Sequence, residues 1–365
     1  MANQLAVADW AVIGCYFFGV LAVGIYAMYT SRKAGKANVN SFFLGGRQMT
    51  WVTVGASLFG SNIAVSHFIG LAGSGAVAGI AVGAYEWNAM FVLLCLGYFF
   101  VPVYLSSNIV TIPDYLARRL GGERLQIYLT IVTLTMYILT ITSANLFAGS
   151  IFIQEVLPVN IYVAVCIVLA IVAVYTILGG LKAVMWTDTV QTFIMLIAAL
   201  IMAVISYREI GGVKNIQTLY MNAIPSVLPN DTKLYNDSSL NICGLPREDS
   251  FNMFRNAKNA DLPWPGLVGA FLNSFWYWCT DQIIVQRTLA AKNLFHAKVG
   301  AAVAALMKLT PVFFMVFVGM VARIKLTDLV ACATEETCLE QCGIAAGCSN
   351  YQPFFIRRNM FHFSE

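Results

Sequence analysis

The sequence is poor in charge: Asp, Glu, Lys and Arg make up 11% of its 365 residues, against about 25% in a soluble domain. Only three residues are His, which leaves little room for a metal centre built from imidazoles. The formal net charge of +4 is small, and nucleic-acid binding has no support. Hydrophobic residues instead account for 59% of the chain. This balance indicates an integral membrane protein.

Apolar runs of roughly 20 residues, the length that crosses a bilayer, occur eight times. They lie near residues 9–29, 51–76, 81–105, 126–157, 160–178, 185–206, 264–284 and 299–322. The first run lacks a basic n-region and a small-residue cleavage site, and it is too long for a signal-peptide core. We therefore expect it to be a retained span, and the sequence predicts eight transmembrane helices.

Basic residues gather in the connections that follow the first, third, fifth and seventh runs. They are Arg32, Lys33, Lys36, Arg47, Arg118, Arg119, Arg124, Lys182, Arg287, Lys292 and Lys298. Because Lys and Arg are concentrated in cytoplasmic loops, we place these connections inside. The N-terminus, the loop 207–263 and the segment 325–350 then lie outside, as expected for a multi-pass protein of the plasma membrane.

The segments expected outside carry the marks of an extracellular compartment. Asn230 and Asn236 begin glycosylation sequons. Four cysteines with equal spacing within each pair follow near the C-terminus, where disulfides are expected to form. Spacing does not decide their connectivity, and our working hypothesis is the pairing Cys332–Cys338 and Cys342–Cys348. Cys243 has no obvious partner.

Several polar residues lie within the apolar runs, where each costs roughly 2.5–3.5 kcal/mol on insertion scales. They are Asn62 with His67, Glu86, Asp188, Asp281 and Lys308. The first two belong to the stretch FGSNIAVSHFIG at 59–70. Its small residues fit close helix packing, or a broken helix whose carbonyls line a cavity and suit a dehydrated sodium ion. Asn62 and His67 favour the break, because neither is small and both need polar partners in lipid.

Each of the other polar positions has a simple and a functional interpretation. Glu86 is either an interfacial carboxylate in contact with water or a buried group. Lys308 lies near the middle of its run, too deep to snorkel easily, so we expect it to face a cavity, a carboxylate or a polar ligand. Asp188 opens the run 185–206 and fits an N-cap, a position compatible with a cation role. The aromatic stretch SFWYWCTDQ at 274–282 fits an interfacial belt, or a sugar site, with rings for the C–H face and polar groups for the hydroxyls.

Several long motifs, in one order, resemble the sodium/solute symporter family, and within it the sodium/glucose cotransporter branch. They are SFFLGGRQMTW at 41–51, ASLFGSNIAVSHFIGLAG at 56–73, EWNA at 86–89, YTILGGLKAVMWTDTVQT at 175–192, DLPWPG at 261–266, WYWCTDQIIVQRTLAAKN at 276–293 and the spaced cysteines of the tail. The resemblance covers about residues 8–350. It implies a transporter, not an enzyme.

The fold implied by the resemblance is all-α, a LeuT-type inverted repeat of two five-helix units preceded by an extra helix. The extra helix would be 9–29, the first repeat 51–206, and the start of the second repeat 264–322, with the outer loop 207–263 between the repeats. The discontinuous helix that opens each repeat would carry SNIAVSH and FWYWCTDQ. The polar stretch at 59–70 would then be a helix break that helps to build the transport site.

The resemblance also implies roles for single residues. Sugar hydroxyls would be contacted by Asn62, His67, Glu86, Ser274, Tyr277, Trp278 and Lys308. Tyr277 would also form an inner gate and Tyr85 an outer gate. The backbone carbonyls of Gly60 and Ile63 would bind the co-transported sodium ion, and Asp188 would couple cation to sugar. The partners implied are sodium, a sugar or polyol, membrane lipid and, in a homo- or hetero-oligomer, further chains.

The resemblance stops after CGIAAGCSN, and the tail YQPFFIRRNMFHFSE contains no run of span length. Since family members continue with further helices, we expect a truncated form with an incomplete second repeat. Two carbonyls fall short of the five or six oxygens, roughly, that a dehydrated sodium ion needs, so we expect no sodium-dependent uptake by this chain alone. The alternative to a symporter is a non-transporting sugar or ion sensor, or a regulatory partner of a full-length transporter.

Overall fold

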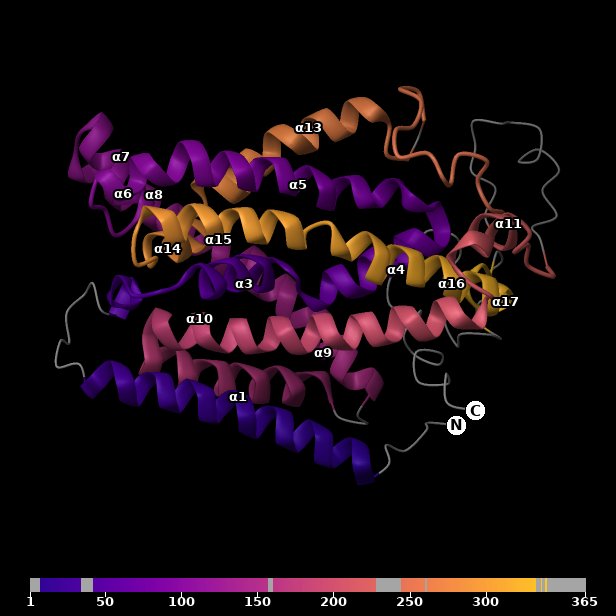
Figure 1. Cartoon of the computed structure of the whole chain (residues 1–365), viewed down its shortest axis with the longest axis horizontal. Helices are drawn as coiled ribbons and strands as arrows, with labels where there is room; N and C mark the ends of the chain where they lie inside the picture. The colour runs from indigo at the N-terminus through magenta and orange to yellow at the C-terminus, as the bar shows by residue number, and fades with distance from the viewer. Residues whose placement is uncertain are drawn as a thin grey trace. The chain divides into compact units, whose positions relative to one another are not determined.

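The computed structural model describes residues 7–33, 42–156, 160–227, 244–259 and 261–332, together with Glu336 and Leu339. Within these residues the chain is built from helices, and no β-strand forms (Figure 1). Contacts divide it into two compact units. The first unit comprises residues 1–65, 89–195 and 273–307, and the second comprises residues 66–88, 196–272 and 308–365.

The main helices follow the apolar runs of the sequence. In chain order they are α1 (Val7–Lys33), α3 (Trp51–Asn62), α4 (Val65–Ala78), α5 (Gly83–Cys95), α6 (Val101–Ser106), α7 (Ile112–Leu120), α8 (Glu123–Met136), α9 (Ser143–Val156), α10 (Ile161–Glu209), α11 (Ile216–Met221), α13 (Trp264–Phe275), α14 (Gln282–Leu289), α15 (Leu294–Met307), α16 (Phe317–Lys325) and α17 (Thr327–Val330). Each of the eight expected spans therefore contains helix.

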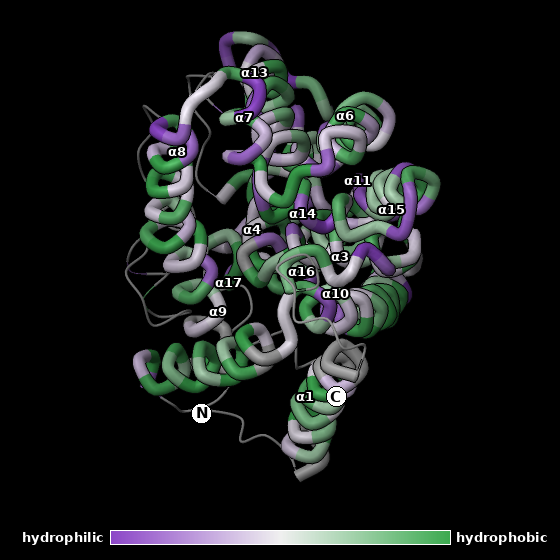
Figure 2. The backbone as a smooth tube through the Cα atoms, turned by 90° about the vertical axis from the view of Figure 1, so that its left-hand side faces the viewer, coloured by the Kyte–Doolittle hydropathy of each residue, from purple (hydrophilic) through white to green (hydrophobic). Residues whose placement is uncertain are grey.

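Four helical stretches are long and apolar enough to cross a membrane by length and composition. They are Ile80–Ser106, Glu123–Ser150, Gly179–Glu209 and Leu294–Lys325. A fifth span results if the two segments of the broken pair α3 and α4 are counted together, and Trp10–Tyr26 and Ile161–Val174 are shorter apolar helices. Hydrophobic residues run along most of α1 and α10 (Figure 2). Many of these side chains are exposed, among them Phe18 and Ile177, as lipid-facing positions require.

The two helix breaks expected from the sequence are present. Helix α3 ends at Asn62, and Ile63 has an extended backbone (φ −77°, ψ 102°) before α4 begins at Val65. Beyond α13, a π-helical turn (Trp276–Thr280) leads to Asp281, which is also extended (φ −67°, ψ 133°) before α14. Backbone of this kind at membrane depth is typical of positions that line a transport cavity.

Helix α10 contains the two predicted spans. We expected spans at 160–178 and 185–206, with a loop around Lys182. The range Ile161–Glu209 is two helices joined at Gly180, whose backbone (φ 58°, ψ −164°) favours glycine, and its apolar stretches are Ile161–Val174 and Gly179–Glu209. A Cβ at Gly180 would also lie 2.8 Å from the carbonyl oxygen of Phe42. The connection between the two spans is therefore tighter than the predicted loop, and the second helix begins before residue 185.

In the first unit, α3 and α15 run side by side (Figure 1). Small residues allow this approach: a Cβ on Gly55 would lie 3.0 Å from the carbonyl oxygen of Gly300, and a Cβ on Gly300 would lie 2.7 Å from Val54. Backbone bonds join Met49 to the residues after α14, with Met49 N donating to the carbonyl of Ala290 at 3.1 Å. The start of α3 and its first half are thus fixed within this unit.

In the second unit, α4 packs equally closely on the segment that follows α15. A Cβ on Gly75 would lie 2.5 Å from the carbonyl oxygen of Val316, and one on Gly319 only 1.9 Å from that of Ala72. Pro311 precedes this segment and cannot donate to the carbonyl of Met307. The turn at Lys308 interrupts the helix at this point, which places a basic side chain where the backbone is locally irregular.

Candidate functional site

Lys308 and Glu86 form a buried ion pair in the second unit. Lys308 Nζ donates to Glu86 Oε2 at 2.6 Å, and the two residues are only 1% and 4% exposed. Burying two charges is costly unless each satisfies the other, and here the pairing is direct. The interfacial interpretation of Glu86 and the snorkelling interpretation of Lys308 are therefore wrong, while the expectation that Lys308 faces a carboxylate is confirmed.

His67, near the start of α4, lies beside this pair. Its Nε2 is 3.9 Å from the second carboxylate oxygen of Glu86, which is longer than a hydrogen bond. The side chain of His67 is 30% exposed, whereas that of Glu86 is 6% exposed. The group thus combines a carboxylate, an ammonium and an imidazole.

The residues around the first break belong to the first unit. Asn62 ends α3 and is half-buried, and Ile63 N donates to the carbonyl of Phe59 at 3.1 Å. Gly60 faces Thr192 of α10 so closely that a Cβ would lie 2.3 Å from Thr192 Oγ1. Across the described ranges, no three His, Cys, Asp or Glu side chains gather as a transition-metal site would need. A sodium ion takes oxygen ligands, including backbone carbonyls.

Asp188 does not cap a helix, contrary to our expectation. The helix runs on from Gly180, so Asp188 lies inside α10, two turns beyond the kink. Its Oδ2 accepts from Ser57 Oγ at 2.7 Å and from Arg287 Nη2 at 3.2 Å. Arg287 Nε also donates to Ser57 Oγ at 2.9 Å. The carboxylate therefore links α3, α10 and α14 within the first unit.

The second break brings together the aromatic candidates and a carboxylate. Tyr277 and Trp278 make an edge-to-face contact with ring centroids 5.1 Å apart, and Trp278 is 3% exposed. Ser274 is half-buried one turn earlier. Asp281 caps α14 by accepting from Ile283 N at 2.9 Å. These aromatics are thus part of a helix end held by polar contacts, and Trp278 is too buried for an interfacial belt residue.

The two gate candidates differ in exposure. Tyr85, beside Glu86 in α5, is 43% exposed, so its ring is open to a ligand or to solvent. Tyr277 is half-buried in the π-helical turn. Candidate residues are divided between the units. The second unit holds His67, Tyr85, Glu86 and Lys308, and the first holds Gly60, Asn62, Ile63, Asp188, Ser274, Tyr277 and Trp278.

Two partners escaped the sequence analysis. Arg287 was counted as a basic residue of a cytoplasmic connection, but it is 8% exposed and pairs with Asp188. Tyr137 of the π-helical turn after α8 donates its hydroxyl to Asp281. A signal existed for Arg287: it lies just after the apolar run 264–284, and that run contains the carboxylate Asp281. The partner of Asp281 left no such signal, because Tyr137 is one of many aromatics in the spans.

Several predicted sites lie outside the described residues. These are the sequons at Asn230 and Asn236 and the cysteines Cys338, Cys342 and Cys348. Cys332 is disulfide-bonded. Cys15, Cys95, Cys166 and Cys279, all within predicted spans, are free thiols. The disulfide lies in the predicted outer segment and the free thiols lie in predicted spans, while the sidedness of these segments and the pairing of the outer cysteines stay predictions.

The fold is that of a sodium-coupled membrane transporter of the LeuT type. It matches the structure of a Na+-coupled sialic acid symporter, solved in a substrate-bound outward-open state, with a TM-score of 0.70, 17% sequence identity and coverage of 87% of this chain and 61% of that one. Residues 42–355 match the Sodium:solute symporter family. The chain belongs to that family, and the apolar helices accordingly belong to a multi-pass membrane protein.

Curated relatives refine the comparison. Sodium/glucose cotransporter 1 of Ovis aries is 49% identical over 344 residues, which are 94% of this chain and 51% of that protein. The Sodium/myo-inositol cotransporter of Canis lupus familiaris is 47% identical over 352 residues, or 96% and 48% of the two chains. Solute carrier family 5 member 4 of Rattus norvegicus is also 47% identical, over 345 residues, with 94% and 50% covered. The chain thus spans about half the length of these relatives.

Proposed function

We propose that this chain serves sodium-coupled symport of glucose or a related hexose across the plasma membrane, with the N-terminus outside. The observation that carries the proposal is the buried pair of Glu86 and Lys308, with the half-buried His67 beside it. A solvent-facing role for the pair is inconsistent with its burial, and a charge pair within a membrane protein is a mark of a substrate or ion pathway. The relatives named for glucose and myo-inositol share this part of the chain.

A sugar suits this group chemically. Glu86 uses one carboxylate oxygen to hold Lys308, and the other faces His67 at a distance that one bridging hydroxyl fits. The carboxylate accepts from hydroxyls, the ammonium donates to them, and the imidazole does either. A polyol such as myo-inositol offers the same hydroxyls, so this group recognises the class and not one member. We propose that Asn62, Ser274, Tyr277 and Trp278 make further sugar contacts.

Sodium is proposed to bind at the first helix break, through the carbonyls of Gly60 and Ile63. Asp188 is proposed to couple the ion to the sugar. Because its carboxylate is already held by Ser57 and Arg287, it would act by making and losing these bonds as α3 and α10 shift, and not as a free ligand. Membrane lipid and oligomeric partners, and the gate roles of Tyr85 and Tyr277, belong to the same proposal.

Uptake in a hybrid transporter tests the proposal. Residues 8–350 of this chain replace their counterpart in the sheep sodium/glucose cotransporter 1, and uptake of labelled glucose and myo-inositol is measured in sodium and in choline. We expect saturable uptake in sodium only, lost in Glu86→Gln. The control is Lys325→Met, which removes an exposed ion pair with Glu209 and should leave uptake unchanged. Sodium-independent uptake, or full activity of Glu86→Gln at equal surface expression, would contradict the proposal.

A further inference from the structure

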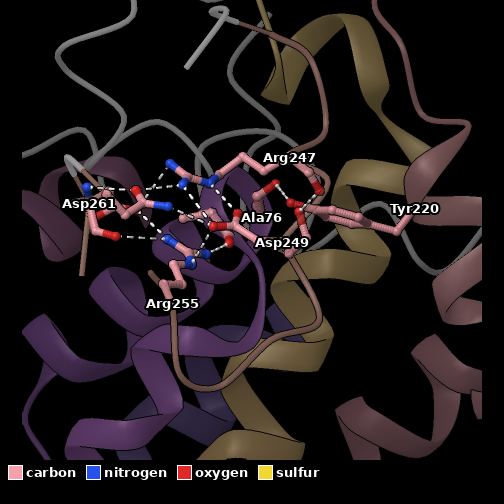
Figure 3. A network of polar contacts seen from close by, with 9 residues as sticks. Ala76, Tyr220, Arg247, Asp249, Arg255 and Asp261 are labelled. Carbon is pink, nitrogen blue, oxygen red and sulfur yellow. Dashed lines mark hydrogen bonds and ion pairs between the residues drawn. The ribbon is translucent and has the colours of Figure 1, made fainter. Parts of the chain in front are cut away.

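The carboxyl end of α4 is covered by side chains from elsewhere in the second unit. The last carbonyls of a helix have no partner within it and carry partial negative charge. At this end Gly79 adopts a positive φ of 85° and donates to the carbonyl of Gly75 at 3.0 Å. The carbonyls of Ala76 and Ala78 instead accept from side chains outside the helix. Figure 3 shows this polar network.

One of these side chains is Arg255, from the segment 244–261, which we name the outer loop segment. Its side chain is fully buried, and Nη2 donates to the carbonyl of Ala78. Nη1 donates to Asp261 Oδ2 at 2.7 Å, and Nε lies 3.6 Å from Asp249 Oδ2. The guanidinium thus joins two acidic residues of its own segment to the end of α4.

The second is Arg323 of α16, which is 2% exposed. Nη1 donates to the carbonyl of Ala76 at 3.1 Å, and Nη2 donates to the carbonyls of Ala223 and Gly244. Tyr220 donates to the same Ala76 carbonyl at 3.0 Å, and its ring lies under the guanidinium, with 5.2 Å between the Arg323 Cζ atom and the ring centroid. Burial raises the pKa of the Tyr220 phenol, so it stays a donor.

The backbones also meet directly. Ile80 N, just beyond α4, donates to the carbonyl of Ser250 at 2.8 Å. A Cβ on Gly79 would lie 2.1 Å from that same carbonyl oxygen, so only glycine allows the approach. The outer loop segment therefore contacts α4 through a backbone bond and a buried arginine at adjoining positions.

We propose that Arg255 and Arg323 form a clamp that fixes the carboxyl end of α4 to the outer loop segment and to α16, and thereby positions His67 at the other end of α4. Nine residues separate His67 from Ala76, about 13 Å along a helix. Three side-chain donors and one backbone hydrogen bond hold this end of α4. We therefore expect α4 to move together with the outer loop segment and α16. Arg255 and Arg323 are positioning residues, and their effect on sugar rests on the proposed function of His67.

Hydrogen exchange of the whole chain in nanodiscs tests the clamp. In Arg255→Gln we expect the amide of Ile80 and those of the last turn of α4, which precedes it, to exchange about tenfold faster, the factor that corresponds to one charge-assisted hydrogen bond. Arg255→Lys should restore part of the protection, because an ammonium still reaches one carbonyl. Arg323→Gln should accelerate the same amides.

The matched control is Arg247→Gln. Arg247 is a second arginine of the outer loop segment and contacts the same acidic residues as Arg255, Asp249 and Asp261, as well as Asn259, but no contact with α4 is among its hydrogen bonds and ion pairs in the described residues. It should accelerate exchange within 244–261 and leave α4 unchanged. Equal acceleration of the α4 amides by Arg247→Gln, or none by Arg255→Gln, would overturn the clamp. If Arg255→Gln does not fold, the exchange rates of the α4 amides are compared in Arg255→Lys and Arg247→Lys. Faster exchange in Arg255→Lys alone would support the clamp, and equal rates would overturn it.

The positioning role has its own readout in the uptake assay described above. Arg255→Gln should raise the half-saturating glucose concentration severalfold with the maximal rate per surface molecule unchanged, and Arg255→Lys should reverse part of this shift. Accelerated exchange with an unchanged half-saturating concentration would overturn the positioning of His67. Failure of the hybrid to transport sugar at all would concern the proposed function, since the exchange experiment needs no sugar.

Discussion

At the scale of single residues, the group of Glu86 and Lys308 is the most consequential feature of the molecule. A buried ion pair contributes little net stability, but each member depends on the other, because removal of one leaves an uncompensated charge in a medium of low dielectric. His67 lies beside the pair, and an imidazole can donate or accept a hydrogen bond. Mutual dependence makes the pair testable through stability as well as through transport.

Stability should follow the pair and not the single residues. Lys308→Met should lower the free energy of unfolding by about 3–5 kcal/mol because Glu86 is left charged and buried, whereas Glu86→Leu with Lys308→Met should restore most of it. Thermal melting of the purified chain in detergent measures this. The exposed pair of Lys325 and Glu209 is the control, with an expected effect of about 0–1 kcal/mol. Additive losses in the double variant would rule out direct coupling.

The stability of the outer loop segment should depend on pH through Asp249. Hydrogen bonds from Arg247 hold the pKa of this carboxyl below its usual range. A lowered folded-state pKa means that the stabilisation is present above the unfolded value of about 3.9 and is lost as the pH falls through the folded value. Melting temperatures of wild type and Asp249→Asn should therefore differ at pH 6 and converge toward pH 2. A difference that stays constant with pH would refute this origin.

The sequence alone predicted a polar partner where the depth of a residue within a span requires one. Lys308 is too deep for its ammonium to reach water, so a polar partner was predictable. Its identity was not, because Glu86 lies 222 residues away, and no local pattern encodes a contact over that separation. Asp188 failed for a different reason: the cap interpretation assumed that a helix starts near residue 185, whereas the second helix of α10 already begins at the kink at Gly180.

At the scale of helices, close packing depends on the absence of side chains. Helix α3 approaches α10 at Gly60, α15 at Gly55, and its own continuation through a break. The break was predictable from the polar residues within an apolar run, and so was the break before α14. The small residues of this stretch fit both close helix packing and a helix break, and Gly60 takes part in both. It lies at the start of the last turn before the break, and it packs on Thr192.

Gly60 should tolerate no larger residue. Gly60→Ala places a Cβ 2.3 Å from Thr192 Oγ1, and this hydroxyl is fixed by donating to the carbonyl of Ala56 at 3.0 Å. We expect a loss of about 1–3 kcal/mol, typical of overpacking, measured by thermal melting. Adding Thr192→Ala should relieve much of it, while Thr192→Val should not, because a methyl group then occupies the place of the hydroxyl. Equal rescue by both would point to a cause other than the clash.

At the scale of the whole molecule, the distribution of charge sets orientation in the membrane. Among the described basic residues of the predicted inner connections, Arg118, Arg119, Arg124 and Lys292 are exposed, whereas Arg47, Lys182 and Lys298 are half-buried. Arg287 is buried and paired with Asp188. The topology does not depend on it, because several other Lys and Arg residues flank the same connection.

Orientation can be read from two exposed lysines. Lys258→Cys in the outer loop segment should react with a membrane-impermeant maleimide on intact cells, and Lys292→Cys should react only after permeabilisation. Both positions are exposed, so the comparison reports sidedness and not burial. Glycosidase should shift the wild-type band, and Asn230→Gln should remove the part of that shift due to Asn230. Labelling of position 292 from outside would show that the orientation is the opposite of the predicted one.

The separation of Glu86 from Lys308 also has a consequence for biogenesis. At about 5–20 residues per second, a ribosome needs roughly 10–45 s to make the 222 residues between them. During that interval the carboxylate is in or near the bilayer without the ammonium that will neutralise it. The α5 segment must therefore be retained at the translocon or remain near the headgroups until the turn that carries Lys308 has been made. In Lys308 variants the carboxylate of Glu86 never gains its partner, so we expect α5 to insert poorly and cellular quality control to retain the protein.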